Sequence, residues 1–117
     1  MVNENATVFV TPTASDPALA EVVRRLVEAY QPERIYLFGS VARGDAGPDS
    51  DYYILVVVPD AAPPDRRRSR LAYQVLRGTG TAADVLVCTR SYLEQRRFLR
   101  ASLPATALRE GMALHGV

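Results

Sequence analysis

The stretch YLFGSVARGDAGPDSDYYILVVVPD, residues 36–60, decides the expected fold of this chain. An apolar run ends at Gly39 and Ser40, a polar loop follows, and Asp51 stands just before a second apolar run, residues 54–58. We expect two strands here, the second over residues 51–58, with their ends meeting at a turn of small residues. The second run is apolar at every position, which indicates a strand buried on both faces in the middle of a sheet covered by helices.

The turn between the two strands has the residue types that an anion site needs. Gly39 lacks a Cβ, so backbone amides beside it can approach an anion closely, and Ser40 adds a hydroxyl where a short helix could begin. A carboxylate at Asp51 could hold Mg²⁺ against the same phosphate, because Mg²⁺ prefers a few carboxylate oxygens plus substrate oxygens. Taken singly, Gly39 and Ser40 fit a plain strand-to-helix turn better, and Asp51 a solvent-exposed carboxylate; together these residues favour a nucleotide site.

The segments before this stretch predict one helix and one strand. Asp16 or Ser15 can cap a helix over residues 17–30, Pro17 suits its first position, and apolar residues recur at helical spacing. Gln31 precedes a proline, which disfavours the α conformation and ends the helix. Residues 34–38 then form the first strand, and residues 8–10 could form a short edge strand.

The segments after it predict two more helices and a third strand. A helix is expected over residues 65–77, with a basic exposed side at residues 66–70 that is either solvated or a partner surface. The third strand covers residues 83–88, with Asp84 near its start. Ser91 and Glu94 have the spacing of a capping box, which predicts a helix over residues 92–101. A proline interrupts it, a short helical piece follows, and a last apolar stretch covers residues 112–114.

These elements predict an α/β (α+β) fold, a small mixed β-sheet flanked by helices. A length of 117 residues predicts one domain over 1–117, with residues 1–14 as a lead-in and no room for a separate substrate domain. The apolar runs are too short for a membrane span and the first residues lack a signal-peptide pattern, so a cytoplasmic location is expected. A net charge of +1 gives no reason to expect nucleic-acid binding. Cys88, the only cysteine, is expected in the core, and His115 has no companion ligand.

The motifs around the turn resemble those of the minimal nucleotidyltransferases of the DNA polymerase β superfamily. That family carries Gly-Ser, then Ala-Arg-Gly, and about ten residues later Ser-Asp-x-Asp before an apolar strand. This chain has Gly39 and Ser40, residues 42–44 as Ala-Arg-Gly, and residues 50–53 as Ser-Asp-Tyr-Tyr. It departs at one position, because Tyr53 stands where the resemblance predicts the second metal-binding aspartate.

The resemblance implies a polymerase β-like fold in which carboxylates on neighbouring strands hold two Mg²⁺ ions and ATP is the substrate. Residue by residue, it implies that Gly39, Ser40 and Arg43 bind the triphosphate, and that Asp51 and Asp84 bind metal and serve catalysis. Tyr53 cannot replace an aspartate, since an uncharged phenol is a poor ligand for a hard cation. A shifted pair of Asp49 and Asp51 also alternates, but it fits the family pattern worse.

The resemblance also implies a function. Minimal members are commonly antitoxins, which transfer AMP to a tyrosine of a helical HEPN-domain toxin, and this chain would then have chemistry impaired by Tyr53. One alternative is a module that only binds a partner or a nucleotide. A further alternative is a nucleotidyltransferase for an aminoglycoside-type small molecule that completes its acceptor pocket by dimerising. Tyr53 is compatible with a natural loss, a deliberate replacement, or an acceptor hydroxyl placed in the site.

Overall fold

The computed structural model describes residues 16–39, 52–99 and 101–116. The expected lead-in therefore lies outside the described residues, as do three of the site residues: Ser40, Arg43 and Asp51. In chain order the elements are α2 (Pro17–Tyr30), β1 (Arg34–Phe38), β2 (Tyr52–Val58), the 3₁₀ helix η1 (Pro64–Arg67), α4 (Ser69–Val75), β3 (Ala83–Thr89), α5 (Arg90–Arg96), α6 (Leu103–Glu110) and β4 (Met112–His115).

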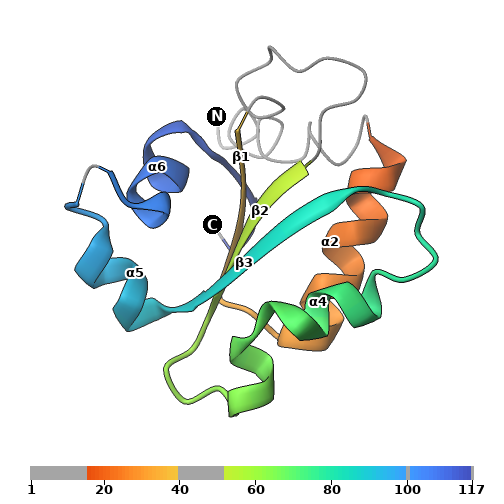
Figure 1. Cartoon of the computed structure of the whole chain (residues 1–117), viewed down its shortest axis with the longest axis horizontal. Coiled ribbons are helices and arrows are strands. Elements are labelled where there is room, and N and C mark those ends of the chain that lie inside the picture. Colours follow the sequence, from red (N-terminus) through yellow and green to blue (C-terminus); the bar gives the residue numbers. More distant parts are fainter. Residues whose placement is uncertain (1–15, 40–51, 100, 117) are drawn as a thin grey trace, which may run out of the picture.

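The four described strands form one mixed sheet in the order β3-β2-β1-β4. β1 is antiparallel to both of its neighbours, whereas β2 and β3 run parallel. Helices α2 and α4 lie on one face of this sheet and α5 and α6 on the other (Figure 1). The expected fold class, a small mixed sheet flanked by helices, is confirmed. Among the described residues no helix is long and apolar enough to cross a membrane.

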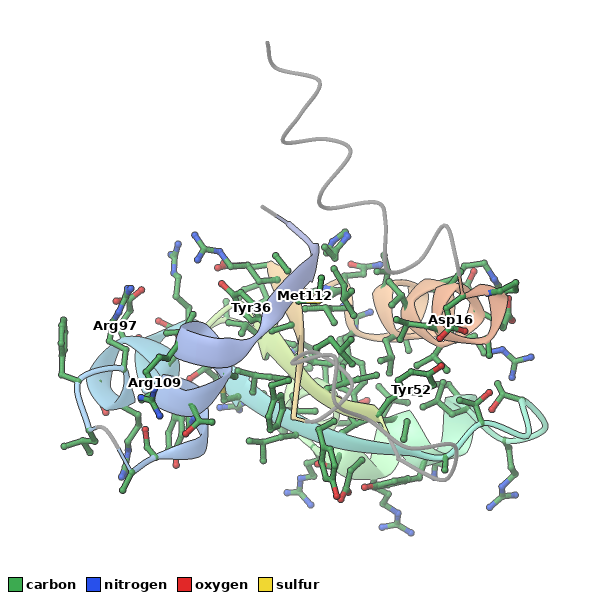
Figure 2. The ribbon with its side chains drawn as sticks, turned by 90° about the horizontal axis from the view of Figure 1, so that it is seen from above. Asp16, Tyr36, Tyr52, Arg97, Arg109 and Met112 are labelled. Carbon is green, nitrogen blue, oxygen red and sulfur yellow. The ribbon has the colours of Figure 1, made fainter. Side chains whose placement is uncertain are left out.

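Helix α2 has the bounds and the cap that its sequence predicts. Asp16 is the N-cap and its Oδ1 accepts a hydrogen bond from the Leu19 amide at 3.1 Å. Gln31 ends the helix in the left-handed conformation, with a φ of 47°. The Asp16 carboxylate also accepts a hydrogen bond from the Tyr52 hydroxyl, and the two side chains face each other in Figure 2. This contact ties the start of α2 to the start of β2.

The central strand β2 supplies both hydrophobic cores. Its residues from Ile54 to Val58 are all buried, as the uniformly apolar run predicts. Ile54, Val56 and Val58 face α2 and α4, while Leu55 and Val57 face α5 and α6. Successive residues of any strand point to opposite faces of the sheet. Because helices cover both faces of this sheet, no polar residue interrupts the run.

The single helix expected over residues 65–77 is wrong, because the chain breaks it at Arg68. That residue is extended, with a φ of −120° and a ψ of 144°, between η1 and α4. The buried Tyr30 hydroxyl lies at the break, where it donates to the Arg68 carbonyl and accepts from the Ala72 amide at 2.9 Å. A side chain from α2 thus satisfies backbone groups that a continuous helix would have paired internally.

The expected capping box at Ser91 is also wrong. Helix α5 begins two residues earlier than expected, at Arg90, and already ends at Arg96; its N-cap is Thr89, whose Oγ1 accepts from the Tyr92 amide at 3.2 Å. Ser91 instead donates its amide and its hydroxyl to the Asp60 carboxylate, in the turn after β2. The Asp60 carboxylate thus binds the Ser91 hydroxyl that a capping box would use, and the helix is capped by Thr89 instead.

The C-terminal segment is more regular than its sequence suggests. Pro104, expected to separate two helical pieces, lies in the first turn of α6, where a proline costs no internal hydrogen bond, and α6 is the expected short helical piece. Ser102 caps this helix by accepting from the Ala105 amide. The apolar stretch that follows becomes β4, which pairs with β1 and includes His115. Cys88 is buried, as expected.

Candidate functional site

Three strand ends meet at one end of the sheet. Because β1 is antiparallel to β2 and β3 is parallel to it, the last residue of β1 lies beside the first residues of the other two strands. Phe38 is paired with Tyr53, and Tyr53 with Asp84. Directly paired residues point to the same face of a sheet, so these three side chains share the face that carries α5 and α6. Gly39, Tyr53 and Asp84 therefore lie at the same end of the sheet, as the sequence predicts.

Gly39 follows β1 and has a conformation suited to glycine, with a φ of +84°. The ring of Tyr53 packs against it: a Cβ on Gly39 would lie 2.9 Å from the Tyr53 Cδ2 atom. Because residue 39 has no side chain, the Tyr53 ring can pack directly against it. That ring covers part of the glycine surface which the sequence analysis assigns to a phosphate.

Tyr53 is 38% exposed at the opening of a small cavity. Its ring lies 6.0 Å from that of Phe38, centroid to centroid, at an interplanar angle of 45°, a separation and tilt typical of aromatic pairs. The cavity has a volume of about 220 Å³ and is lined by Phe38, Tyr53, Asp84, Val85 and Leu86. The tyrosine therefore fills space between the turn glycine and the one described carboxylate of the site.

Asp84 has a neighbour that sequence reasoning missed. The Tyr73 hydroxyl, from α4, donates a hydrogen bond to Asp84 Oδ1 at 3.0 Å. Burial raises the pKa of Tyr73 above its ordinary value, and the hydrogen bond to Asp84 raises it further. Nothing in the spacing of these two residues signals the contact, because it depends on how α4 packs beside β3.

The described residues do not by themselves fit a two-metal centre. Two metal ions need several converging carboxylates, and no group of three or more His, Cys, Asp or Glu side chains converges among the described residues. Asp84 is the one carboxylate lining the small cavity, and its paired neighbour is the uncharged Tyr53. Asp51, the other expected ligand, lies outside the described residues.

The fold is that of a small mixed-sheet α/β protein whose strand ends meet at one place, and the sequence assigns it to a family. The sequence model described as "Nucleotidyltransferase domain" matches residues 19–109. This match spans most of the chain, from α2 to the last turn of α6. The chain belongs to the nucleotidyltransferase domain family. No curated protein matches it closely enough to count as a relative.

Solved structures resemble the chain in fold. A crystal structure of a toxin–antitoxin with AMP-PNP is 22% identical and has a TM-score of 0.53, and the match covers 83% of this chain and 73% of that one. A structure from Sulfolobus solfataricus, described only as a candidate nucleotidyltransferase, is 26% identical with a TM-score of 0.48, covering 68% and 70%. A mutant of the toxin–antitoxin MntA–HpeT is 20% identical with a TM-score of 0.47, covering 81% and 71%. The first of these supports the mixed-sheet fold.

Proposed function

We propose that this chain is a minimal nucleotidyltransferase of the antitoxin type, in which Tyr53 impairs transfer. Its activity would be transfer of AMP from ATP to a helical HEPN-type toxin. The observation that carries the proposal is the position of Tyr53, paired with Asp84 on one side and packed on Gly39 on the other. The residue that departs from the family motif thus lies between Gly39 and Asp84, the two candidate site residues beside it that the structure describes.

Two comparisons support the partner and the substrate. Family membership supports a nucleotide substrate in general. The similar toxin–antitoxin structure contains AMP-PNP, an ATP analogue, and it makes a toxin partner and ATP the first choices to test. The HEPN type of the toxin and the AMP group rest on the motif resemblance.

The proposal gives each motif residue a role. Gly39, Ser40 and Arg43 would bind the triphosphate, while Asp51 and Asp84 would hold Mg²⁺. When bound, the metal would supply charge neutralisation at the phosphate. Of these residues, Asp84 lies beside the cavity and keeps its carboxylate in place through Tyr73.

Tyr53 should impair transfer for two separate physical reasons. It removes a negative charge from the position next to Asp84, which weakens any metal site there. Its ring also lies in van der Waals range of Gly39, where a phosphate would approach the backbone. A substitution that removes the ring without adding a charge separates these two effects.

The test is transfer of label from α-labelled ATP with Mg²⁺ to a candidate HEPN protein. We compare the wild-type chain with Tyr53→Asp, which restores the carboxylate, and with Tyr53→Asn. Asparagine has nearly the same shape as aspartate but carries no charge. Transfer by Tyr53→Asp should exceed that of the wild type and of Tyr53→Asn by roughly 100-fold, the scale on which metal-site changes act. Tyr53→Asp combined with Asp84→Asn should lose the gain.

A binding-only module is the second candidate, and the packing of the Tyr53 ring on Gly39 favours it. In that case the chain would neutralise its partner by covering a surface. The binding-only candidate predicts that no variant transfers label, while the wild type and Tyr53→Asp bind the HEPN protein with the same affinity. That result would refute the proposed enzyme and leave the partner assignment standing.

A further inference from the structure

Strand β3 lies at the end of the described sheet and has one pairing partner, β2. The Tyr52 amide donates to the Ala82 carbonyl at 3.2 Å, so the backbone groups of residue 82 point toward β2. Backbone groups of successive strand residues point to alternate sides, which turns those of Val87 outward. Within the described ranges, no hydrogen bond reaches the outward groups of Val87. An open edge of this kind is a template for another strand.

A groove follows this edge. Its volume is about 500 Å³, and its lining includes four consecutive residues of β3, Leu86, Val87, Cys88 and Thr89. Consecutive strand residues face opposite sides of a sheet, so a groove lined by all four must lie along the edge of the strand and not on one face. The edge is therefore accessible from Leu86 to Thr89, and just before this stretch Tyr73 from α4 reaches across the edge to Asp84.

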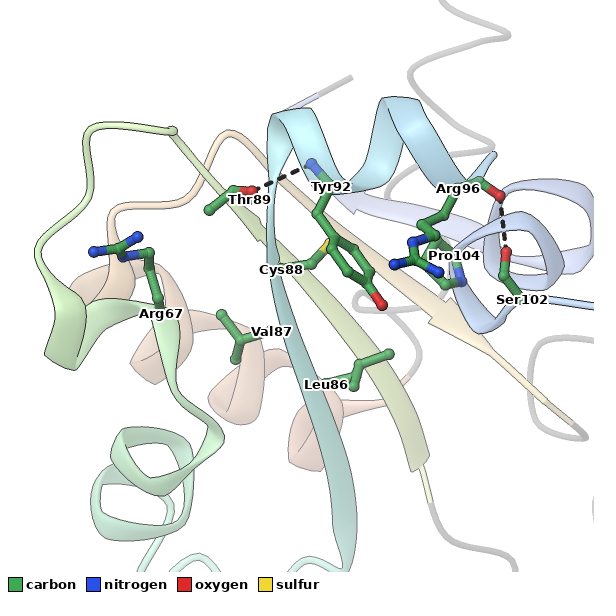
Figure 3. A pocket seen from close by; sticks show the side chains of 9 residues that line it. All are labelled: Arg67, Leu86, Val87, Cys88, Thr89, Tyr92, Arg96, Ser102 and Pro104. Atoms are coloured by element: carbon green, nitrogen blue, oxygen red, sulfur yellow. Dashed lines mark hydrogen bonds between the residues drawn. The ribbon is translucent and has the colours of Figure 1, made fainter. Parts of the chain in front are cut away.

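Arginines flank the groove on both sides of the sheet. Figure 3 shows Arg67, from η1, on one side of β3, and Tyr92 and Arg96, from α5, on the other. The Arg96 guanidinium lies 4.7 Å from the Tyr92 ring centroid. Both arginines are exposed, and within the described part of the chain neither has a carboxylate at salt-bridge distance.

We propose that this groove binds an extended, acidic segment of a partner protein, which pairs with β3 as an added strand. Adjacent residues of an added strand point to opposite faces, so one carboxylate would reach Arg67 and the next would reach the side of Arg96. Tyr92, Leu86 and Pro104 form an apolar wall for a neighbouring side chain. Exposed tyrosine and arginine are the residue types that most often dominate binding at protein interfaces.

Charge argues for a foreign partner over a second copy of this chain. Pairing of two β3 edges would bring the Arg67 and Arg96 side chains of both copies into one groove. Like charges placed opposite each other across a strand pair are destabilising, whereas carboxylates would neutralise them. The same argument disfavours residues 1–15 as the occupant, since Glu4 is the only acidic residue among residues 1–14.

The inference goes beyond the proposed function and does not depend on nucleotidyl transfer. It assigns a docking edge on β3 whose groove shares Leu86, and no other lining residue, with the small cavity of Tyr53 and Asp84. Failure of either proposal leaves the other intact, because one is read by label transfer and the other by peptide binding.

The test selects peptides from a random library on the full chain and on the variant Arg67→Glu/Arg96→Glu. The wild type should enrich peptides that combine adjacent carboxylates with an apolar residue, and the variant should not. A selected acidic peptide, made synthetically, should bind the variant at least roughly tenfold more weakly in fluorescence anisotropy. Arg70→Glu is the matched control: an exposed arginine near Arg67 that does not line the groove, with affinity expected near that of the wild type.

Amide hydrogen exchange of Val87 locates the peptide. Protection of this amide should rise on peptide addition, because the peptide supplies the missing backbone acceptor. The proposal fails if no acidic peptide is enriched, if Arg70→Glu weakens binding as much as the double variant does, or if Val87 gains no protection. It also fails if Val87 is protected in the free chain, since removal of residues 1–15 or dilution of a dimer would then identify another occupant.

Discussion

At the scale of single residues, the site depends on which side chain lies next to which. Tyr53 is paired with Asp84 and packs on Gly39, so one side chain affects both the metal-binding and the phosphate-binding parts of the motif. Tyr73 adds a hydroxyl from a helix to the same carboxylate. These contacts make residue 53 the position with the greatest expected effect on function.

Gly39→Ala tests the contact between the turn and the tyrosine ring. The φ of +84° disfavours any side chain, and the new Cβ would lie 2.9 Å from Tyr53 Cδ2. We expect the substitution to lower the free energy of unfolding by about 2 to 3 kcal/mol in urea denaturation. In a Tyr53→Ser background the clash is absent, and the cost should fall to about 1 to 2 kcal/mol. Equal costs in the two backgrounds would contradict the packing described here.

Cys88 should be unreactive in the folded chain. Burial raises the pKa of its thiol to about 11, and the thiolate is the form that reacts. A disulfide reagent near neutral pH should therefore modify the native chain far more slowly than the urea-unfolded chain. Rapid modification without denaturant would show that the strand edge opens readily in solution.

At the scale of elements, one tyrosine positions the helix that covers β3. Tyr30 is fully buried, and its hydroxyl bonds the Arg68 carbonyl and the Ala72 amide. Arg25, also from α2, donates to the carbonyls of Val75 and Arg77 at the other end of α4, both at 3.0 Å. Helix α4 is too short to be stable alone, so these contacts from α2 hold it in place.

Tyr30→Phe removes the hydroxyl and keeps the ring. It leaves a carbonyl and an amide without their partner beside the core, so the free energy of unfolding should fall by about 1 to 3 kcal/mol. The matched control is Tyr92→Phe, where an exposed hydroxyl is lost and the change should stay within about 0.5 kcal/mol. Equal urea midpoints for the two variants would show that Tyr30 does not anchor α4.

At the scale of the whole molecule, two phenols link elements of the fold: Tyr30 joins α2 to α4, and Tyr52 joins β2 to the start of α2. Burial is the main cause that raises the pKa of Tyr30 and of Tyr52 to about 12 each. The hydrogen bond to the Asp16 carboxylate also raises that of Tyr52. These shifts make the fold sensitive to alkali.

The sign of that sensitivity follows from the raised values. Below about pH 10, the ordinary value for tyrosine, the phenols are protonated in both states and their contribution to stability is fully present. As the pH rises toward 12, the unfolded chain loses these protons first, so stability falls. Urea midpoints should therefore drop between about pH 10 and about pH 12, and Tyr30→Phe should drop less steeply. A flat profile would contradict the burial of both phenols.

The sequence by itself determined most of the elements and the place of the candidate site. Helix α2 and strands β1, β2 and β3 begin and end within a residue or so of their predicted bounds. Their signals are local: a cap, a proline, an apolar period, or an uninterrupted apolar run. The position of Gly39 and Asp84 at the same end of the sheet was also predictable, because Gly39 follows one strand and Asp84 lies near the start of another.

Only the tertiary structure decided the features that depend on residues far apart in the chain. The helix break at Arg68 needs Tyr30, the start of α5 needs Asp60 to bind Ser91, and Asp84 receives its hydrogen bond from Tyr73. The open edge of β3 follows from the strand order, which no local pattern contains. The physical reason is the same throughout: local propensities differ by small energies, so a single hydrogen bond or buried contact from a distant element is enough to choose among them.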